Sequence, residues 1–217
     1  MNNTDLSHCS NIIWDWNGTL LNDLDVCVTA INLLLKKRNL VTLSAERYSD
    51  IFTFPVKDYY EVAGFDFEKE PFETVAVEFM DHYFRLVVSA GLHPAVNSTL
   101  KYFKNSGRKQ VILSAMEQVE LINLVKKRDI DHYFEKIFGI QDHLAHGKLE
   151  MARKAILETG FDRSITCLIG DTLHDAEVAG ELGIHCILIA DGHQSGKRLK
   201  SSGYPVIQSL NEIRKVF

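Results

Sequence analysis

Short apolar runs alternate with amphipathic stretches from residue 90 to the C-terminus. The runs are nearly continuous in apolar residues, which is typical of strands buried on both faces, and the stretches between them have helical spacing. With a further run near the N-terminus, this pattern predicts an α/β fold with a doubly wound, Rossmann-like parallel sheet of six strands. The predicted strands are residues 12–15, 109–114, 136–140, 165–170, 185–190 and 205–208, and the predicted helices are residues 95–105, 117–128, 148–159, 175–182 and 196–200.

The segment 22–88 follows a different pattern, because its apolar residues recur at helical spacing and no strand-like run interrupts them. We therefore predict an α/β core formed by residues 1–21 and 89–217, with a small all-helical cap domain of residues 22–88 inserted after the first strand. The predicted helices of this domain are residues 26–35, 44–51, 57–62 and 72–90.

The composition limits the possible functions. A net charge of −5 over 217 residues does not suggest a nucleic-acid-binding surface, and the helical segment holds more acidic than basic residues. No apolar run approaches the roughly 18 residues that span a bilayer, and the N-terminal segment lacks the features of a signal peptide. The four cysteines are scattered, and Cys167 and Cys186 lie in predicted core strands, so neither disulfides nor a zinc site are expected. We expect a cytoplasmic protein that binds neither nucleic acid nor a membrane.

The candidate nucleophile is Asp15, which ends the first apolar run and precedes a turn at Gly18. Ligand crevices of open α/β sheets lie at the carboxyl ends of the strands, so a carboxylate at this position is well placed for chemistry. An aspartate there can also simply cap the segment that follows.

Three later stretches strengthen this interpretation. Ser114 ends a predicted strand, Lys148 begins a predicted helix, and Asp171 and Asp175 follow another strand in the segment Gly-Asp-Thr-Leu-His-Asp. Taken singly, these residues could be a helix cap, a solvated lysine and two carboxylates that stabilise a helix N-terminus. Their order and their positions at the ends of elements favour a phosphoryl-transfer site.

Together, the four stretches resemble the motifs of the haloacid dehalogenase superfamily, and within it the phosphoglycolate phosphatase-like members. The resemblance covers nearly the whole chain. It implies a Rossmann-like core, a helical cap that closes over the site, and hydrolysis of a small phosphomonoester through an aspartyl-phosphate. We do not expect phosphoglycolate itself to be the substrate on this ground alone.

The resemblance also implies a role for each site residue. Asp15 would attack phosphorus, while Ser114, the backbone amides of Ala115 and Met116, and Lys148 would bind the phosphoryl group. Asp15, Asp171, Asp175 and the backbone carbonyl of Asn17 would bind Mg²⁺, since oxygen ligands favour a hard cation.

Asn17 departs from the superfamily pattern, which usually has a second aspartate two residues after the nucleophile. An amide cannot exchange a proton near neutral pH, and general acid–base catalysis typically contributes about 10²- to 10⁴-fold in rate. Three hypotheses follow. In the first, the protein is a phosphatase that is slow, prefers a good leaving group or borrows a proton carrier. In the second, it is a phosphate-binding or regulatory module. In the third, it catalyses another reaction, such as phosphonate cleavage or phosphoryl transfer to a second substrate.

Several further residues are possible contributors. Asp81 and His82 are candidate proton carriers; Arg47, Lys57 and Arg85 could meet a second anion of a small phosphorylated substrate; and Phe54-Pro55-Val56 could form a loop over the crevice. We expect His143, His146 and His174 to be ordinary histidines, whereas the polar loop 192–196 could border the site. The expected oligomeric state is a monomer or weak homodimer.

Overall fold

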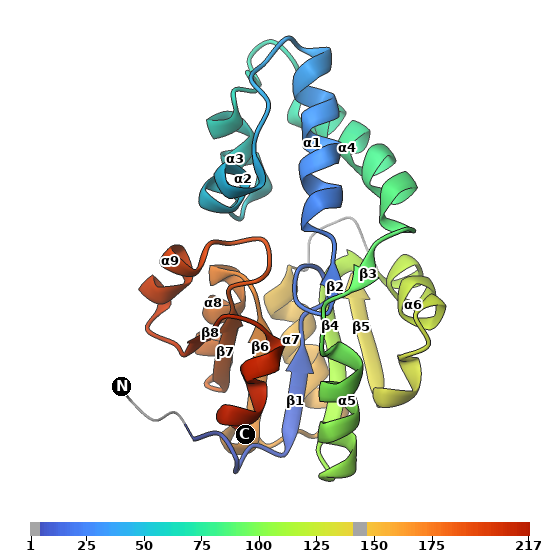
Figure 1. The fold of residues 1–217 in the computed structure, drawn as a ribbon, viewed down its shortest axis with the longest axis vertical. Coiled ribbons are helices and arrows are strands. Elements are labelled where there is room, and N and C mark those ends of the chain that lie inside the picture. The colour runs from blue at the N-terminus through green and yellow to red at the C-terminus, as the bar shows by residue number, and fades with distance from the viewer. Residues whose placement is uncertain (1–4, 141–146) are drawn as a thin grey trace.

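The computed structural model describes residues 5–140 and 147–217. Its main sheet has six parallel strands in the order β5-β4-β1-β6-β7-β8, which confirms the predicted α/β fold with a parallel sheet (Figure 1). The strands are β1 (Asn11–Trp14), β4 (Lys109–Glu117), β5 (Lys136–Ile140), β6 (Thr166–Gly170), β7 (His185–Ile189) and β8 (Val206–Ile207).

Two apolar cores cover the two faces of this sheet, because successive side chains of a strand point to opposite sides. Ile12 and Trp14 of β1 belong to one core, whereas Ile13 belongs to the other. The first core is covered by α5 (Val96–Asn105), α6 (Gln118–Lys127) and the 3₁₀-helix η4 (Leu210–Lys215), and the second by α7 (Lys148–Thr159), α8 (Leu173–Leu182) and α9 (Gly196–Leu199). Cys167 and Cys186 are buried in these cores, as predicted.

Four helices lie beyond the carboxyl ends of the strands, above the sheet in Figure 1. Helices α1 and α4 pack side by side, and α2 and α3 lie across from them. Their bounds are α1 (Leu24–Lys37), α2 (Ala45–Ile51), α3 (Val56–Ala63) and α4 (Phe72–Val87). The division into a core of residues 1–21 with 89–217 and a cap of residues 22–88 stays a prediction.

A short antiparallel ladder was not predicted. It joins β2 (Leu21–Asn22) to β3 (Gly91–Leu92), so the chain enters and leaves the four-helix layer at neighbouring points. Two-residue strands leave no periodic signal in a sequence, because alternation needs at least several residues to be recognised.

No helix in the described part of the chain is both long and apolar enough to cross a bilayer. The short connecting 3₁₀-helices are η1 (Asp131–Tyr133), η2 (Arg163–Ile165) and η3 (Lys200–Ser202).

Candidate active site

Asp15 lies at the carboxyl edge of the central strand. The register pairs Trp14 of β1 with Ile112 on one side and with Ile169 on the other, and the Asp15 amide donates to the Ile169 carbonyl at 2.9 Å. The parallel register therefore brings the segments after β1 and β6 to one edge of the sheet, where β4 also carries Ser114.

Three carboxylates from this edge form a buried cluster. Asp15, Asp171 and Asp175 each offer an oxygen within 4.8 Å of the others, and all three side chains are almost completely buried. Burial raises the pKa of Asp15 well above its usual value, and the two other carboxylates add to this effect against the opposing influence of Lys148. Burial likewise raises the pKa of Asp171 to about 6. Both shifts mean that the charged form of these carboxylates is costly here unless a positive charge lies nearby.

Lys148 supplies the cation of this cluster. It is the first residue of α7, its side chain is buried, and its Nζ donates to Asp15 and, at 2.5 Å, to Asp175. Burial alone would lower the pKa of Lys148, but the two carboxylates raise it, so the ammonium stays charged. Burial alone would raise the pKa of Asp175. The Lys148 charge and the hydrogen bonds from Thr172 instead hold this pKa below its usual value.

The donor set fits a divalent cation. Three carboxylates and one ammonium leave a net negative charge in a buried space, and the ligands are all oxygen, as Mg²⁺ prefers. The backbone is packed closely around the Asp171 carboxylate, because a Cβ atom at Gly18 or Gly192 would collide with it. Gly18 also has a φ of 73°, which a glycine adopts without strain.

Ser114 of β4 lines the same cavity as Asp15 and Lys148, but the strand does not end there as predicted. It continues to Glu117 through an irregularity in its pairing with β5, which begins after Leu113. The Met116 amide donates to the Ser114 hydroxyl at 3.1 Å, whereas Ala115 lines the cavity beside it. The Met116 amide therefore already has an acceptor within the protein, which counts against its expected role in binding the phosphoryl group.

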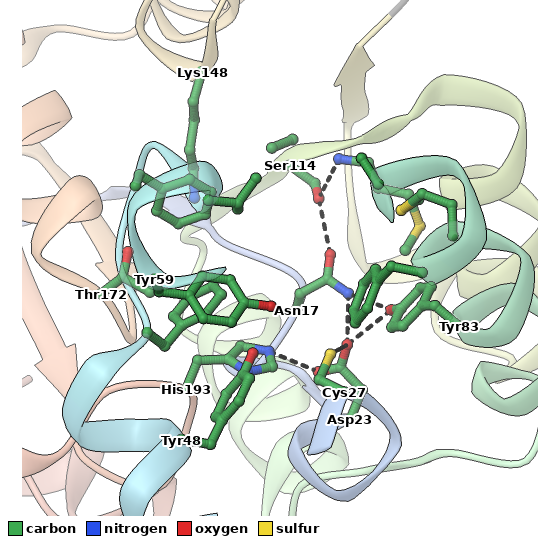
Figure 2. Close-up of a pocket in the computed structure, with 18 of the residues that line it drawn as sticks. Asn17, Asp23, Cys27, Tyr48, Tyr59, Tyr83, Ser114, Lys148, Thr172 and His193 are labelled. Carbon is green, nitrogen blue, oxygen red and sulfur yellow. Dashed lines mark hydrogen bonds and ion pairs between the residues drawn. The ribbon is translucent and has the colours of Figure 1, made fainter. Parts of the chain in front are cut away.

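Asn17 belongs to a polar network that the sequence did not reveal. Its amide nitrogen donates to Asp23 at 2.7 Å and to the Tyr83 hydroxyl at 2.6 Å (Figure 2). Asp23 is fully buried and also accepts from Tyr83 and from the backbone of Gly18. The His193 imidazole lies 3.2 Å from the other side of Asp23.

Charge is balanced within this second network. Burial alone would raise the pKa of Asp23, but His193 and the hydrogen bonds from Asn17 and Tyr83 hold it below its usual value. Burial alone would lower the pKa of His193, but Asp23 raises it to about 9. His193 comes from the polar loop after β7, and it confirms that this loop borders the site.

A cavity of about 240 Å³ connects the two networks to the helical layer. Its walls include the predicted loop residues Phe54 and Val56. One face of α4, which carries Tyr83, forms a further wall (Figure 2). That face presents Tyr83 but neither Asp81 nor His82, so neither of the proposed proton carriers lines the cavity.

The three cationic residues suggested for a second anion also lie outside the cavity lining. Arg47 and Arg85 are exposed, and the Lys57 ammonium lies over the Phe67 ring, 5.6 Å from its centroid. His174 pairs with Glu177 at 3.1 Å and is not a member of the carboxylate cluster, whereas His143 and His146 lie outside the described residues.

The fold and the site together define a Rossmann-like α/β protein. A buried cluster of aspartates whose oxygens could hold a cation lies beneath its helical layer. Residues 12–189 match the family described as haloacid dehalogenase-like hydrolase. The chain belongs to this family of hydrolases.

Individual relatives agree with this assignment. The chain is 26% identical over 203 residues to the "probable phosphatase IndB" of Dickeya dadantii (strain 3937), covering 90% of this chain and 87% of that protein. A haloacid dehalogenase-like hydrolase from Streptococcus pneumoniae superposes with a TM-score of 0.82 at 19% identity, covering 96% and 98% of the two chains. A predicted phosphoglycolate phosphatase from Haemophilus somnus 129pt gives a TM-score of 0.76 at 20% identity, with the same coverage of both chains. At these identities, the two solved structures establish the fold.

Proposed function

We propose that the protein is a Mg²⁺-dependent phosphatase that hydrolyses a small phosphomonoester through an aspartyl-phosphate on Asp15. The observation that carries this proposal is the buried meeting of Asp15, Asp171, Asp175 and Lys148 at the carboxyl edge of the central strands. The similarity to a protein described as a phosphatase supports the reaction class.

In the proposed first step, a carboxylate oxygen of Asp15 attacks phosphorus and the bond to the leaving oxygen breaks. Ser114 and Lys148 lie on the cavity wall where they can donate to the phosphoryl oxygens, and Ala115 can do so through its backbone amide. In the second step, a water attacks phosphorus and the bond to Asp15 breaks, which releases phosphate and restores the carboxylate.

Asp15, Asp171, Asp175 and the backbone carbonyl of Asn17 are the proposed ligands of Mg²⁺. The bound ion would neutralise the crowded carboxylates and stabilise the charge on the transferring group. This assignment agrees with the composition of the cluster, which has three buried carboxylates and one ammonium.

The amide of Asn17 cannot deliver a proton to the leaving oxygen. The amide nitrogen instead donates hydrogen bonds to Asp23 and to the Tyr83 hydroxyl. We therefore propose that turnover is fastest for leaving groups that depart readily as anions.

Phosphate release from acetyl phosphate and 4-nitrophenyl phosphate tests the proposal. We expect release to require Mg²⁺, to stop with a chelator, and to fall by at least about 10³-fold in Asp15→Asn, because the variant lacks the nucleophile. Rapid acid quenching followed by mass spectrometry should detect one phosphoryl group on the Asp15 peptide.

Asp25→Asn is the matched control, since Asp25 is exposed in the first turn of α1. This variant should retain wild-type turnover. Release that persists in Asp15→Asn, or that proceeds equally with chelator, would contradict the proposed mechanism.

A further inference from the structure

The cavity above Asp15 has two facing aromatic walls. One wall comes from α2, α3 and the segment between them, where the rings of Tyr48 and Phe52 stack with centroids 5.2 Å apart. The other comes from α4, where Phe79 stacks on Tyr83 at 6.0 Å. Figure 2 shows Tyr48 and Tyr59 on one side of the cavity and Tyr83 on the other.

The polar ends of two of these rings already have partners within the protein. The Tyr83 hydroxyl donates to Asp23 at 2.8 Å, and the Tyr48 hydroxyl lies 3.3 Å from the Nδ1 of His193. What remains for a ligand on these walls is chiefly ring faces and aliphatic groups.

The cationic groups on the cavity lining are also already paired with carboxylates. Within the described residues that line it, Lys148 pairs with Asp15 and Asp175, and His193 pairs with Asp23. An anionic group on the leaving part of a substrate would therefore lose water without gaining an unpaired cation, which is unfavourable in a buried site.

The size of the cavity matches one ring and one phosphoryl group. An apolar cavity of roughly 150 Å³ is enough to hold benzene, and this cavity measures about 240 Å³. A flat ring between the two walls can form the offset or edge-to-face contacts that aromatic pairs prefer.

The absence of a general acid at position 17 also favours a substrate with an aromatic leaving group. Asn17 occupies the position beside the nucleophile and cannot protonate a leaving oxygen. A phenolate departs without a proton far more readily than an alkoxide, so an aryl ester suits both the amide at this position and the aromatic walls.

We propose that the substrate is an aryl phosphate, a phosphomonoester whose leaving group is a single aromatic ring without a second anionic group. This inference rests on the proposed phosphatase function and assigns the helical layer the role of selecting the leaving group. It argues against phosphoglycolate, whose leaving group bears a carboxylate.

Two comparisons on the wild-type protein separate ring binding from leaving-group reactivity. Benzyl phosphate and ethyl phosphate both release an alcohol of similar acidity, so their ratio of kcat/KM isolates the ring. We expect benzyl phosphate to be at least tenfold better. Phenyl phosphate should in turn exceed benzyl phosphate, because both hold a ring but only the first releases a phenolate.

A cavity-filling variant tests the location of the ring. Ala76 of α4 lines the cavity, whereas the next residue of the same helix, Val77, is 63% exposed and lies outside the lining. Ala76→Phe should lower the ratio of kcat/KM for phenyl phosphate to kcat/KM for acetyl phosphate by at least tenfold. Val77→Phe should leave this ratio unchanged.

The outcomes distinguish this inference from the proposed function. If acetyl phosphate is hydrolysed with Mg²⁺ but benzyl phosphate is no better than ethyl phosphate, or phosphoglycolate is the best substrate, the inference is wrong and the phosphatase function stands. If no phosphate ester or acetyl phosphate is hydrolysed in an Asp15-dependent way, the proposed function itself fails. Should Ala76→Phe not fold, the wild-type ratio of benzyl to ethyl phosphate still decides the matter.

Discussion

Asn17 shows how one side chain can fit its surroundings while departing from the family pattern. Its amide nitrogen is the donor in short contacts to Asp23 and to Tyr83, both of which are buried. A carboxylate at position 17 could not donate these hydrogen bonds and would face the Asp23 carboxylate directly. The amide is therefore structurally matched to Asp23, whatever its consequence for proton transfer.

Replacing this amide by a carboxylate should destabilise the protein. We expect Asn17→Asp to lower the free energy of unfolding by roughly 2–3 kcal/mol at pH 7, since it removes a hydrogen bond to a charged buried group and adds a like charge. Urea denaturation followed by circular dichroism measures the change. Asn123→Asp, at an exposed position of α6, adds the same charge without this contact and should change stability little. Equal stability of the two variants would show that Asp23 does not require a donor at position 17.

At the scale of elements, α1 and α4 are joined by apolar packing and by a charged contact at one end. Arg38, which follows α1, donates to Glu70 at 2.6 and 2.7 Å and to Glu78 of α4 at 2.8 Å. Glu78 also accepts from Lys37 at 2.8 Å. The contact links segments some forty residues apart in the chain, so it helps to hold the helical layer together.

This contact should make the stability of the helical layer sensitive to acid. Burial alone would raise the pKa of Glu78, but Lys37 and Arg38 hold it below its usual value. The stabilisation is therefore present above about pH 4.5, the ordinary glutamate pKa, and is lost as the pH falls through the lowered value of the folded state.

The variant Glu78→Gln measures this contribution. We expect it to reduce the free energy of unfolding by about 0.5–1 kcal/mol at pH 7 and low salt, because the contact is partly screened by solvent. Thermal unfolding of the two proteins should converge as the pH falls below 4.5. Glu61→Gln, at an exposed residue without an ion pair in the described part of the chain, serves as the control. A difference that persists unchanged at pH 3 would argue against an ionic origin.

At the scale of the whole molecule, the parallel sheet collects groups from distant parts of the chain at one edge. Lys148 is brought into contact with Asp15 across 133 residues of sequence and with Asp175 across 27. The helical layer then covers this edge with apolar side chains, which keeps the charged cluster away from water and strengthens its electrostatic interactions.

Mg²⁺ should stabilise the folded protein even when no substrate is present. A ligand that binds only the folded state at about 100 times its Kd contributes roughly 2.7 kcal/mol, which for a chain of this size is a rise in Tm of roughly 5–10 °C. Differential scanning calorimetry with Mg²⁺ and with chelator measures the shift. In Asp171→Asn the shift should shrink strongly, since one proposed ligand loses its charge. A shift of the same size in both proteins would place the bound ion elsewhere.

The order and the type of the elements could be predicted from the sequence because both follow from local periodicity. The same local argument located Asp15, Lys148, Asp171 and Asp175 at the ends of strands or the beginnings of helices, and the structure places all four together. Their proposed roles stay predictions. The two-residue strands β2 and β3 and the continuation of β4 beyond Ser114 were missed, because they depend on pairing with distant segments.

The sequence by itself thus determined the parallel α/β fold and the set of charged residues at one edge of its sheet. Only the tertiary structure decided what surrounds them. The contact of Asp23 with His193 spans 170 residues, and that of Asn17 with Tyr83 spans 66. Periodicity identifies which residues share a face of an element, but it does not say which elements that face will meet. For this reason the aromatic walls of the cavity, and the absence of Asp81 and His82 from them, became apparent only in the folded chain.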